Sequence, residues 1–128
     1  MTIFDLSLPR LRYLSDIFGV AAETRYSTEA ALAEALLSAD LVIGAVLIPG
    51  ASAPRIVSGG QLKQMEPGAV LVDVAIDQGG CFETSKITNH KSPTFEKFGV
   101  IHYCVPNIPS RVSRTASISI SQVLTNLL

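Results

Sequence analysis

The sequence lacks several motifs that identify large classes of enzymes. Its nine glycines lie at positions 19, 44, 50, 59, 60, 68, 79, 80 and 99, and no spacing among them gives the pyrophosphate-binding loop G-x-G-x-x-G. The G-x-S-x-G elbow of serine hydrolases, the H-E-x-x-H motif of zinc proteases and the Walker loop are also missing. The commonest serine hydrolase, zinc protease and P-loop assignments are therefore excluded.

Charge of one sign and long apolar runs are scarce as well. Ten basic and eleven acidic residues give a formal net charge of −1, and basic residues gather only in pairs such as Arg10 and Arg12, which argues against a nucleic-acid partner. The longest apolar run, residues 41–49, is well short of the ~20 residues that span a membrane. The N-terminus has no basic segment and carries Asp5 where a signal peptide is apolar, so we expect a cytoplasmic protein.

Cysteine is rare too. Cys81 and Cys104 match no metal-ligand spacing, so we expect both to be reduced, buried small side chains and expect no metal site. His102 and Cys104 share one face of a predicted strand, but nothing supplies a third and fourth ligand, which favours a packed or hydrogen-bonded histidine. His90 is expected in a loop.

What the sequence does contain is a regular alternation of strands and helices. With 128 residues that are 48% hydrophobic, the chain is expected to form one globular domain. Strands are predicted at residues 2–6, 21–26, 41–47, 69–76 and 100–105. Helices are predicted from Pro9 to Gly19, from a cap at Ser27 or Thr28 to Asp40, at 61–65, as one turn at 94–97, and at 113–128. This order indicates an α/β fold with right-handed crossovers and a parallel sheet.

Two of the predicted strands run into loops with glycine, proline and an isolated acid. In open α/β sheets ligands bind beyond the carboxyl ends of the strands, so these loops predict a ligand crevice. Asp77 precedes two glycines there and is the preferred functional acid, although an Asx-type turn is the alternative. Asp73, predicted inside the strand, is expected to be a buried acid paired with backbone or a basic group. Asp5 closes the first strand and could hold the ribose of NAD or simply cap a turn.

Residues 39–115, ADLVIGAVLIPGASAPRIVSGGQLKQMEPGAVLVDVAIDQGGCFETSKITNHKSPTFEKFGVIHYCVPNIPSRVSRT, closely resemble the NAD-binding domain of alanine dehydrogenases. The resemblance begins at residue 1, where TIFDLSLPRL is similar to the second Rossmann strand and helix of that family. Transhydrogenase alpha subunits share the fold but typically have an asparagine-bearing sequence where this chain has AIDQGGCFE. The resemblance implies NAD as cofactor and the reaction of L-alanine, NAD and water to pyruvate, ammonia and NADH.

The same resemblance implies roles for particular residues. Asp77 would be the active-site acid that orients the substrate and handles charge as the imine forms and is hydrolysed. Asp5 would hold the adenosine ribose, with Arg10 and Ser27 near the adenine. The implied contacts around the nicotinamide and beside the strand ends are Val46, Leu47, Val74, Ala75, Ile76, Asp77, Lys86, Val105, Pro106, Asn107 and Ile108.

Two positions depart from the family pattern. Lys86 stands where many members have arginine, which keeps the charge and loses the planar fork. Pro106 replaces a small residue in a turn and therefore removes a backbone donor.

The first Rossmann strand, its glycine loop and its helix are not matched by any part of the sequence, and neither is the domain that binds the substrate. We therefore expect residues 1–128 to form an incomplete, Rossmann-like, doubly wound sheet whose central strand is missing. The strands that begin at Thr2 and near Asp40 would pair directly, enclose a strand of another chain, or keep open edges that promote association.

Three functions stay open from the sequence. The first is a piece of an NAD-dependent alanine dehydrogenase that does not catalyse alone. The second is a non-catalytic nucleotide-binding or interaction module that forms homo-oligomers or associates with full-length subunits. The third is a transhydrogenase-type NAD-binding domain.

Overall fold

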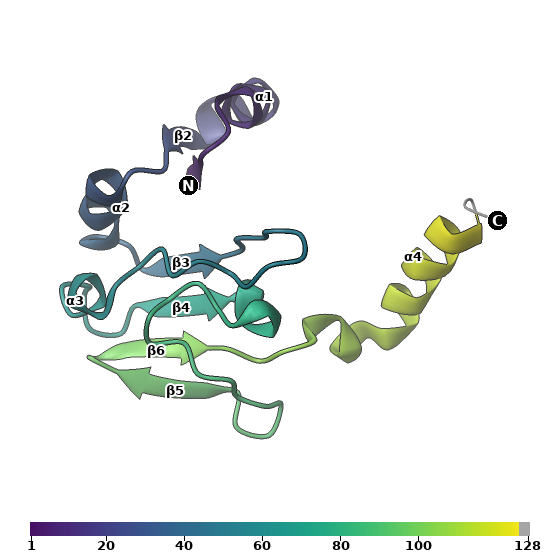
Figure 1. The fold of residues 1–128 in the computed structure, drawn as a ribbon. Coiled ribbons are helices and arrows are strands. Elements are labelled where there is room, and N and C mark those ends of the chain that lie inside the picture. Colours follow the sequence, from purple (N-terminus) through teal and green to yellow (C-terminus); the bar gives the residue numbers. More distant parts are fainter. Residues whose placement is uncertain (126–128) are drawn as a thin grey trace.

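A computed structural model describes residues 1–125 of the chain (Figure 1). Six short strands form its sheets: β1 Thr2–Asp5, β2 Glu23–Tyr26, β3 Leu41–Gly44, β4 Val70–Asp73, β5 Thr94–Lys97 and β6 Val100–Tyr103. The helices are α1 Leu8–Phe18, α2 Glu29–Leu36, α3 Gly59–Leu62 and α4 Ser113–Thr125. Three 3₁₀ turns complete the order: η1 Gly19–Ala21, η2 Val74–Gln78 and η3 Ile108–Val112.

The strands are divided between two sheets. β1 pairs with β2 in parallel, while β3, β4 and β6 form a parallel sheet to which β5 adds an antiparallel edge. These parallel ladders confirm the predicted α/β class. Within residues 1–125, β1 and β3 do not pair with each other, which excludes the direct pairing considered above. Figure 1 shows the two sheets apart, with α2 connecting them.

Local capping explains where the first two long helices begin. The side chain of Ser7 accepts a hydrogen bond from the N–H of Arg10 at 3.3 Å, and Pro9 occupies the first turn, where a missing N–H is harmless. Thr28 caps α2 by accepting from the N–H of Ala31 at 3.2 Å. The predicted helices over these residues are confirmed, and Thr28 rather than Ser27 is the cap. The predicted helix at 113–128 is confirmed as far as Thr125, and its last three residues lie outside the described ones.

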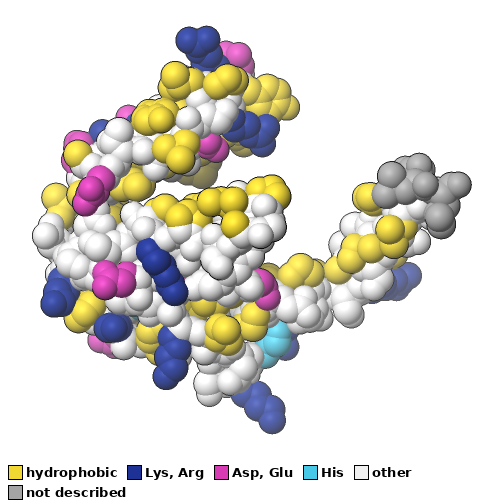
Figure 2. Space-filling view, viewed as in Figure 1, with side chains coloured by type: hydrophobic (Ala, Val, Ile, Leu, Met, Phe, Trp, Pro, Cys, Tyr) yellow, Lys and Arg dark blue, Asp and Glu magenta, His cyan; other side chains and the backbone are white. Residues whose placement is uncertain are grey.

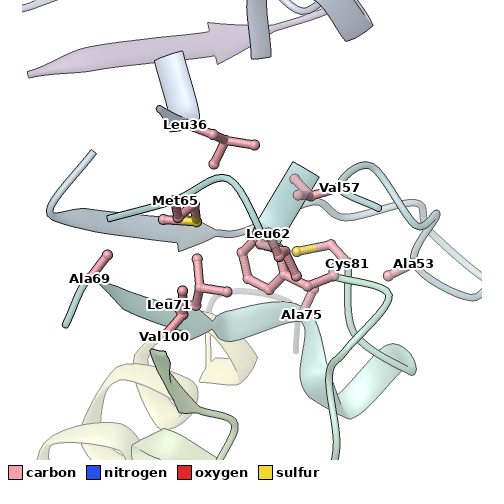
Figure 3. Close-up of a cluster of buried hydrophobic side chains, with 11 residues drawn as sticks. Leu36, Ala53, Val57, Leu62, Met65, Ala69, Leu71, Ala75, Cys81 and Val100 are labelled. Carbon is pink, nitrogen blue, oxygen red and sulfur yellow. The ribbon is translucent and has the colours of Figure 1, made fainter. Parts of the chain in front are cut away.

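The core lies between the β3–β4 sheet and the segment around α3 (Figure 3). Leu71, at the centre of β4, is fully buried and packs with Leu62 of α3 and Val100 of β6. The buried cluster consists of Leu36, Ala53, Val57, Leu62, Met65, Ala69, Leu71, Ala75, Cys81, Phe82 and Val100. Because these residues hold β4 between β3 and β6, the carboxyl ends of the three parallel strands are fixed relative to one another.

The turn of helix predicted at residues 94–97 is wrong, because Thr94–Lys97 is strand β5. Phe98 and Gly99 connect β5 to β6 with φ values of 58° and 77°, the two positive angles typical of the tight hairpin turn that joins antiparallel strands. Phe95 is then placed against the ring of His102, with the ring centroids 4.7 Å apart. A positive φ is uncommon for phenylalanine, so the turn gave no clear signal in the sequence.

Two strands end earlier than predicted. β3 ends at Gly44, where a Cβ would overlap Cys81 Sγ, because the returning loop crosses the strand end at this point. β4 ends at Asp73, after which η2 turns the chain. Asp73 is therefore the last residue of its strand and not an interior one, whereas Val46, Leu47, Val74, Ala75 and Ile76 lie in the loops beyond the sheet.

None of the helices within residues 1–125 combines the length and the apolar character needed to cross a membrane.

Candidate functional site

Three loops leave the carboxyl edge of the four-stranded sheet side by side. One follows Gly44 of β3, the second is η2 after β4, and the third runs from Cys104 to η3 after β6. Strands β3, β4 and β6 are parallel, so these loops meet at the edge where α/β folds bind ligands.

Asp77 and Asn107 join two of these loops. The N–H of Asn107 donates to both carboxylate oxygens of Asp77, at 3.2 Å each. Asn107 has φ 52°, a left-handed backbone that asparagine tolerates better than most residues and that directs its N–H toward η2. The carboxylate of Asp77 therefore bonds across 30 residues of sequence and not to its own turn, while its exposed side chain stays accessible.

The other residues implied at this edge divide by exposure. Leu47 is 67% exposed and Val74 is 44% exposed, so their side chains can contact a ligand. Ala75, Ile76 and Val105 are buried, so only their backbone atoms can line a site. Of the remaining positions, Lys86 and Asn107 are exposed, and Val46, Pro106 and Ile108 are partly exposed.

A second group lies at the ends of β1 and β2. Asp5 Oδ1 accepts from the N–H of Ser7 at 2.7 Å, and the N–H of Ser27 donates to the carbonyl of Asp5 at 3.0 Å. Asp5 and Ser27 are thus neighbours. Arg10 lies on the first turn of α1, where its guanidinium stacks over the ring of Tyr13 at 5.2 Å.

A cavity of about 470 Å³ separates this group from the larger sheet. Leu6, Ser27 and Leu32 line one side of it, and Arg55 and Ser58 line the other. Figure 2 shows this face hollowed between the part of the molecule that carries α1 and the four-stranded sheet. Within the described residues β1 and β3 are both edge strands, each paired on one side only.

Below the strand ends lies a buried polar cluster built around Asp73. Its carboxylate accepts from the N–H of Cys81 at 3.0 Å and from the hydroxyl of Ser85, which confirms the predicted pairing of a buried acid with backbone. The thiol of Cys81 contacts the other carboxylate oxygen at 3.6 Å. Burial and the charge of Asp73 raise the pKa of Cys81 to about 12, and burial also raises the pKa of Cys104. Both thiols are buried and protonated, so neither is a nucleophile.

His102 is a packed, hydrogen-bonded histidine, as predicted. Its Nδ1–H donates to the carbonyl of Val100 at 2.9 Å, and Nε2 accepts from the hydroxyl of Thr84 at 2.7 Å. Burial lowers the pKa of His102, which keeps the ring neutral. His90 lies on the exposed loop and pairs with the hydroxyl of Ser110 at 3.1 Å. Among residues 1–125, no three His, Cys, Asp or Glu side chains are grouped to hold a metal ion.

Comparison with known proteins identifies the family. Residues 1–128 match the family Alanine dehydrogenase/PNT, C-terminal domain. The chain is 53% identical over 126 residues to the alanine dehydrogenase of Halomonas elongata, covering 98% of the chain and 33% of that protein. It is also 53% identical over 124 residues to the alanine dehydrogenase of Bacillus subtilis, covering 96% of the chain and 33% of that protein.

Solved structures agree with the sequence matches. An L-alanine dehydrogenase superposes with a TM-score of 0.91 at 48% identity, covering 95% of this chain and 34% of that one. A transhydrogenase from Sinorhizobium meliloti superposes with a TM-score of 0.69 at 28% identity, covering 83% and 29%. The chain thus spans about a third of the length of the relatives it matches, and it belongs to the alanine dehydrogenase/PNT C-terminal domain family.

Proposed function

We propose that residues 1–128 form part of the NAD-binding domain of an L-alanine dehydrogenase, which converts L-alanine, NAD and water to pyruvate, ammonia and NADH. The observation that carries this proposal is the contact between Asp77 and Asn107, which sets an exposed carboxylate at the carboxyl edge of the sheet. The high identity to alanine dehydrogenases supports this reaction over that of a transhydrogenase.

The residues present fit NAD at both ends. Asp5 and Ser27 lie together at the ends of β1 and β2, where an acid can accept the hydroxyls of the adenosine ribose, and Arg10 stands nearby on α1. Exposed Leu47 and Val74 offer apolar contact to a nicotinamide ring beside Asp77. Val46, Lys86, Pro106 and Ile108 complete the surroundings, with the backbone of Ala75, Ile76 and Val105. When bound, the cofactor accepts the hydride from the substrate.

Asp77 orients the substrate and balances its charge. Its two carboxylate oxygens share the N–H of Asn107, and the side chain remains exposed. A carboxylate held in this way attracts the ammonium group of alanine and stabilises positive charge on the imine that water then hydrolyses. The groups that bind the substrate carboxylate belong to a separate domain outside residues 1–128.

A chimera tests the reaction. Residues 1–128 replace the matching third of the Halomonas elongata enzyme, and alanine-dependent reduction of NAD is followed by absorbance. The chimera is expected to be active, and Asp77→Asn is expected to lower turnover about a hundredfold or more, whereas the control Asp16→Asn, on the exposed face of α1, leaves it unchanged. A folded chimera that binds NADH and leaves alanine untouched would refute the assignment.

The 128-residue chain alone is expected to bind without turnover. NADH fluorescence should saturate on titration, weakly, because no glycine loop is present to hold the pyrophosphate. Formation of NADH from alanine by this chain alone would contradict the proposal.

The open edges of β1 and β3 support self-association in the cytoplasm. Within the described residues both are edge strands with unpaired backbone on one side, and Leu41 and Ile43 of β3 are exposed. A second copy of the chain covers these edges. Sedimentation over a range of concentrations should show a mass above the 13.6 kDa of one chain, and a constant monomer mass would contradict it. Association only with an added full-length subunit would assign the edges to that partner instead.

A further inference from the structure

A buried carboxylate closes the loop that carries Asp77. Asp73 is fully buried at the end of β4, and the chain beyond it turns through η2 and returns at Cys81. The N–H of Cys81 donates to Asp73 Oδ2 at 3.0 Å, and the hydroxyl of Ser85 donates to the same oxygen. The two ends of the Asp77 loop are thus held together by one carboxylate oxygen.

The returning backbone is shaped around this oxygen. Gly80 has φ +82°, and a Cβ at this position would lie 2.6 Å from Asp73 Oδ2. The N–H of Gly80 donates to the carbonyl of Ala75 at 3.0 Å, and the N–H of Gly79 donates to the carbonyl of Ile76 at 3.0 Å. The conformation of the loop therefore depends on the close approach of its backbone to Asp73.

A buried carboxylate at position 73 is not explained by a gain in the stability of the fold. The ion pairs within residues 1–125 join Arg25 to Glu23 and Glu34, so no basic nitrogen of that part of the chain compensates Asp73. Taking a carboxylate out of water is unfavourable unless donors surround it. Here the donors are the backbone of Cys81, the hydroxyl of Ser85 and the thiol of Cys81.

The same cluster reaches the other two strand ends. The sulfur of Cys81 lies close to Gly44, the last residue of β3, so that a Cβ at Gly44 would overlap it. Asp73 also pairs with Gly44 in the β3–β4 ladder, and Val72 before it pairs with Tyr103, the last residue of β6. Asp73 thus lies where the loops carrying Val46, Asp77 and Asn107 begin.

We propose that Asp73 is a positioning residue that holds the Asp77 loop, through Cys81 N–H and the Ser85 hydroxyl, in the conformation in which Asp77 meets Asn107. The expected effect of Asp73 on cofactor binding rests on the proposed function. The expected effect of Asp73 on the Asp77–Asn107 contact does not.

The amide proton resonance of Asn107 reports that contact directly. In Asp73→Ala this resonance is expected to move to the position that it has in Asp77→Ala, because the loop loses its acceptor. Asp73→Asn should restore the wild-type position, since an amide oxygen can accept the same two hydrogen bonds. Cys81→Ala is the matched control: it truncates another fully buried side chain of the cluster but keeps the N–H, so the resonance should stay in place.

A purely structural role predicts something else. Asp73→Ala and Cys81→Ala would then both lower the melting temperature and leave the Asn107 resonance in place, and that result would overturn the proposal. Failure of Asp73→Asn to restore the wild-type position of the resonance would also overturn it. If Asp73→Ala does not fold, Ser85→Ala provides the test. A shift of the Asn107 resonance toward its position in Asp77→Ala, but smaller, supports the proposal, and an unchanged resonance overturns it.

NADH affinity separates this proposal from the proposed function. Asp73→Ala is expected to weaken NADH binding at least fivefold while Cys81→Ala changes it less than twofold. If the wild-type chain binds no NADH, the proposed function of the chain fails, and the Asn107 resonance still decides the role of Asp73.

Discussion

At the scale of single residues, Gly80 satisfies two independent requirements. Its φ of +82° disfavours any side chain, and a Cβ would also lie 2.6 Å from the carboxylate of Asp73. Its neighbour Gly79 has φ +98°, but a Cβ there would meet no atom within 4 Å. The pair therefore separates backbone strain from steric overlap.

Gly80→Ala is expected to lower the free energy of unfolding by about 2 to 4 kcal/mol, from strain and overlap together. Gly79→Ala should lower it by only about 1 kcal/mol, because strain acts there alone. Urea denaturation of the two variants measures the difference. Equal losses would show that the approach to Asp73 contributes nothing.

His102 makes the stability depend on pH. Burial lowers its pKa below the ordinary value of 6.5, so between these two values the unfolded chain binds more protons than the folded one. The contribution of His102 is therefore complete above about pH 6.5 and falls as the pH drops toward the lowered pKa.

Melting temperatures of the wild type and of His102→Gln should consequently converge as the pH falls from about 7 to 5. A gap between wild type and His102→Gln that stays constant with pH would refute this account.

Which side chains of the site are buried or exposed could largely be predicted from the sequence, but their hydrogen-bond partners could not. Exposure of Asp77 and burial of Asp73, His102 and the two cysteines follow from the sequence, because residue type and strand position govern burial. The bond from Asn107 to Asp77 spans 30 residues, and it depends on a left-handed backbone that no local pattern revealed.

At the scale of elements, strand cores were easier to predict than strand ends. Apolar runs place β3, β4 and β6 correctly, yet β3 and β4 end where a loop from elsewhere in the sequence crosses them, at Gly44 and Asp73. β5 was missed because its hairpin depends on a positive φ at Phe98. These ends are set by tertiary contacts, which a periodicity in sequence does not contain.

β4 is the element on which the core depends most. Leu71→Ala is expected to lower the free energy of unfolding by about 2 to 5 kcal/mol, because this side chain is fully buried within the cluster. Leu41→Ala on β3, where the side chain is 56% exposed, should lower it by less than about 1 kcal/mol. Thermal denaturation checks both, and similar losses would mean that the core is not centred on β4.

At the scale of the whole molecule, the resemblance to alanine dehydrogenases and the usual Rossmann strand order predicted a missing neighbour between β1 and the larger sheet. The structure shows which arrangement follows: within residues 1–125 the two sheets remain separate, and α2 carries the chain between them. The hollow in Figure 2 results from this separation.

Self-association through the open edge of β3 should depend on the exposed side chains of this strand. Ile43→Lys is expected to raise the dissociation constant of the oligomer at least tenfold, because Ile43 is 61% exposed beside the open edge. Ile87→Lys is the matched control, since Ile87 is 63% exposed on the loop after η2. Sedimentation of both variants provides the measurement, and equal weakening would place the interface elsewhere.

The two buried thiols have a consequence for how opening of the carboxyl edge can be followed. Cys81 and Cys104 are fully buried, and both are protonated and inaccessible while the strand ends are closed. An alkylating reagent can therefore modify them only after this part of the fold opens, whether locally or globally. The rate at which the reagent labels these thiols therefore reports how often the carboxyl edge of the sheet opens. The measurement needs neither a ligand nor an engineered probe.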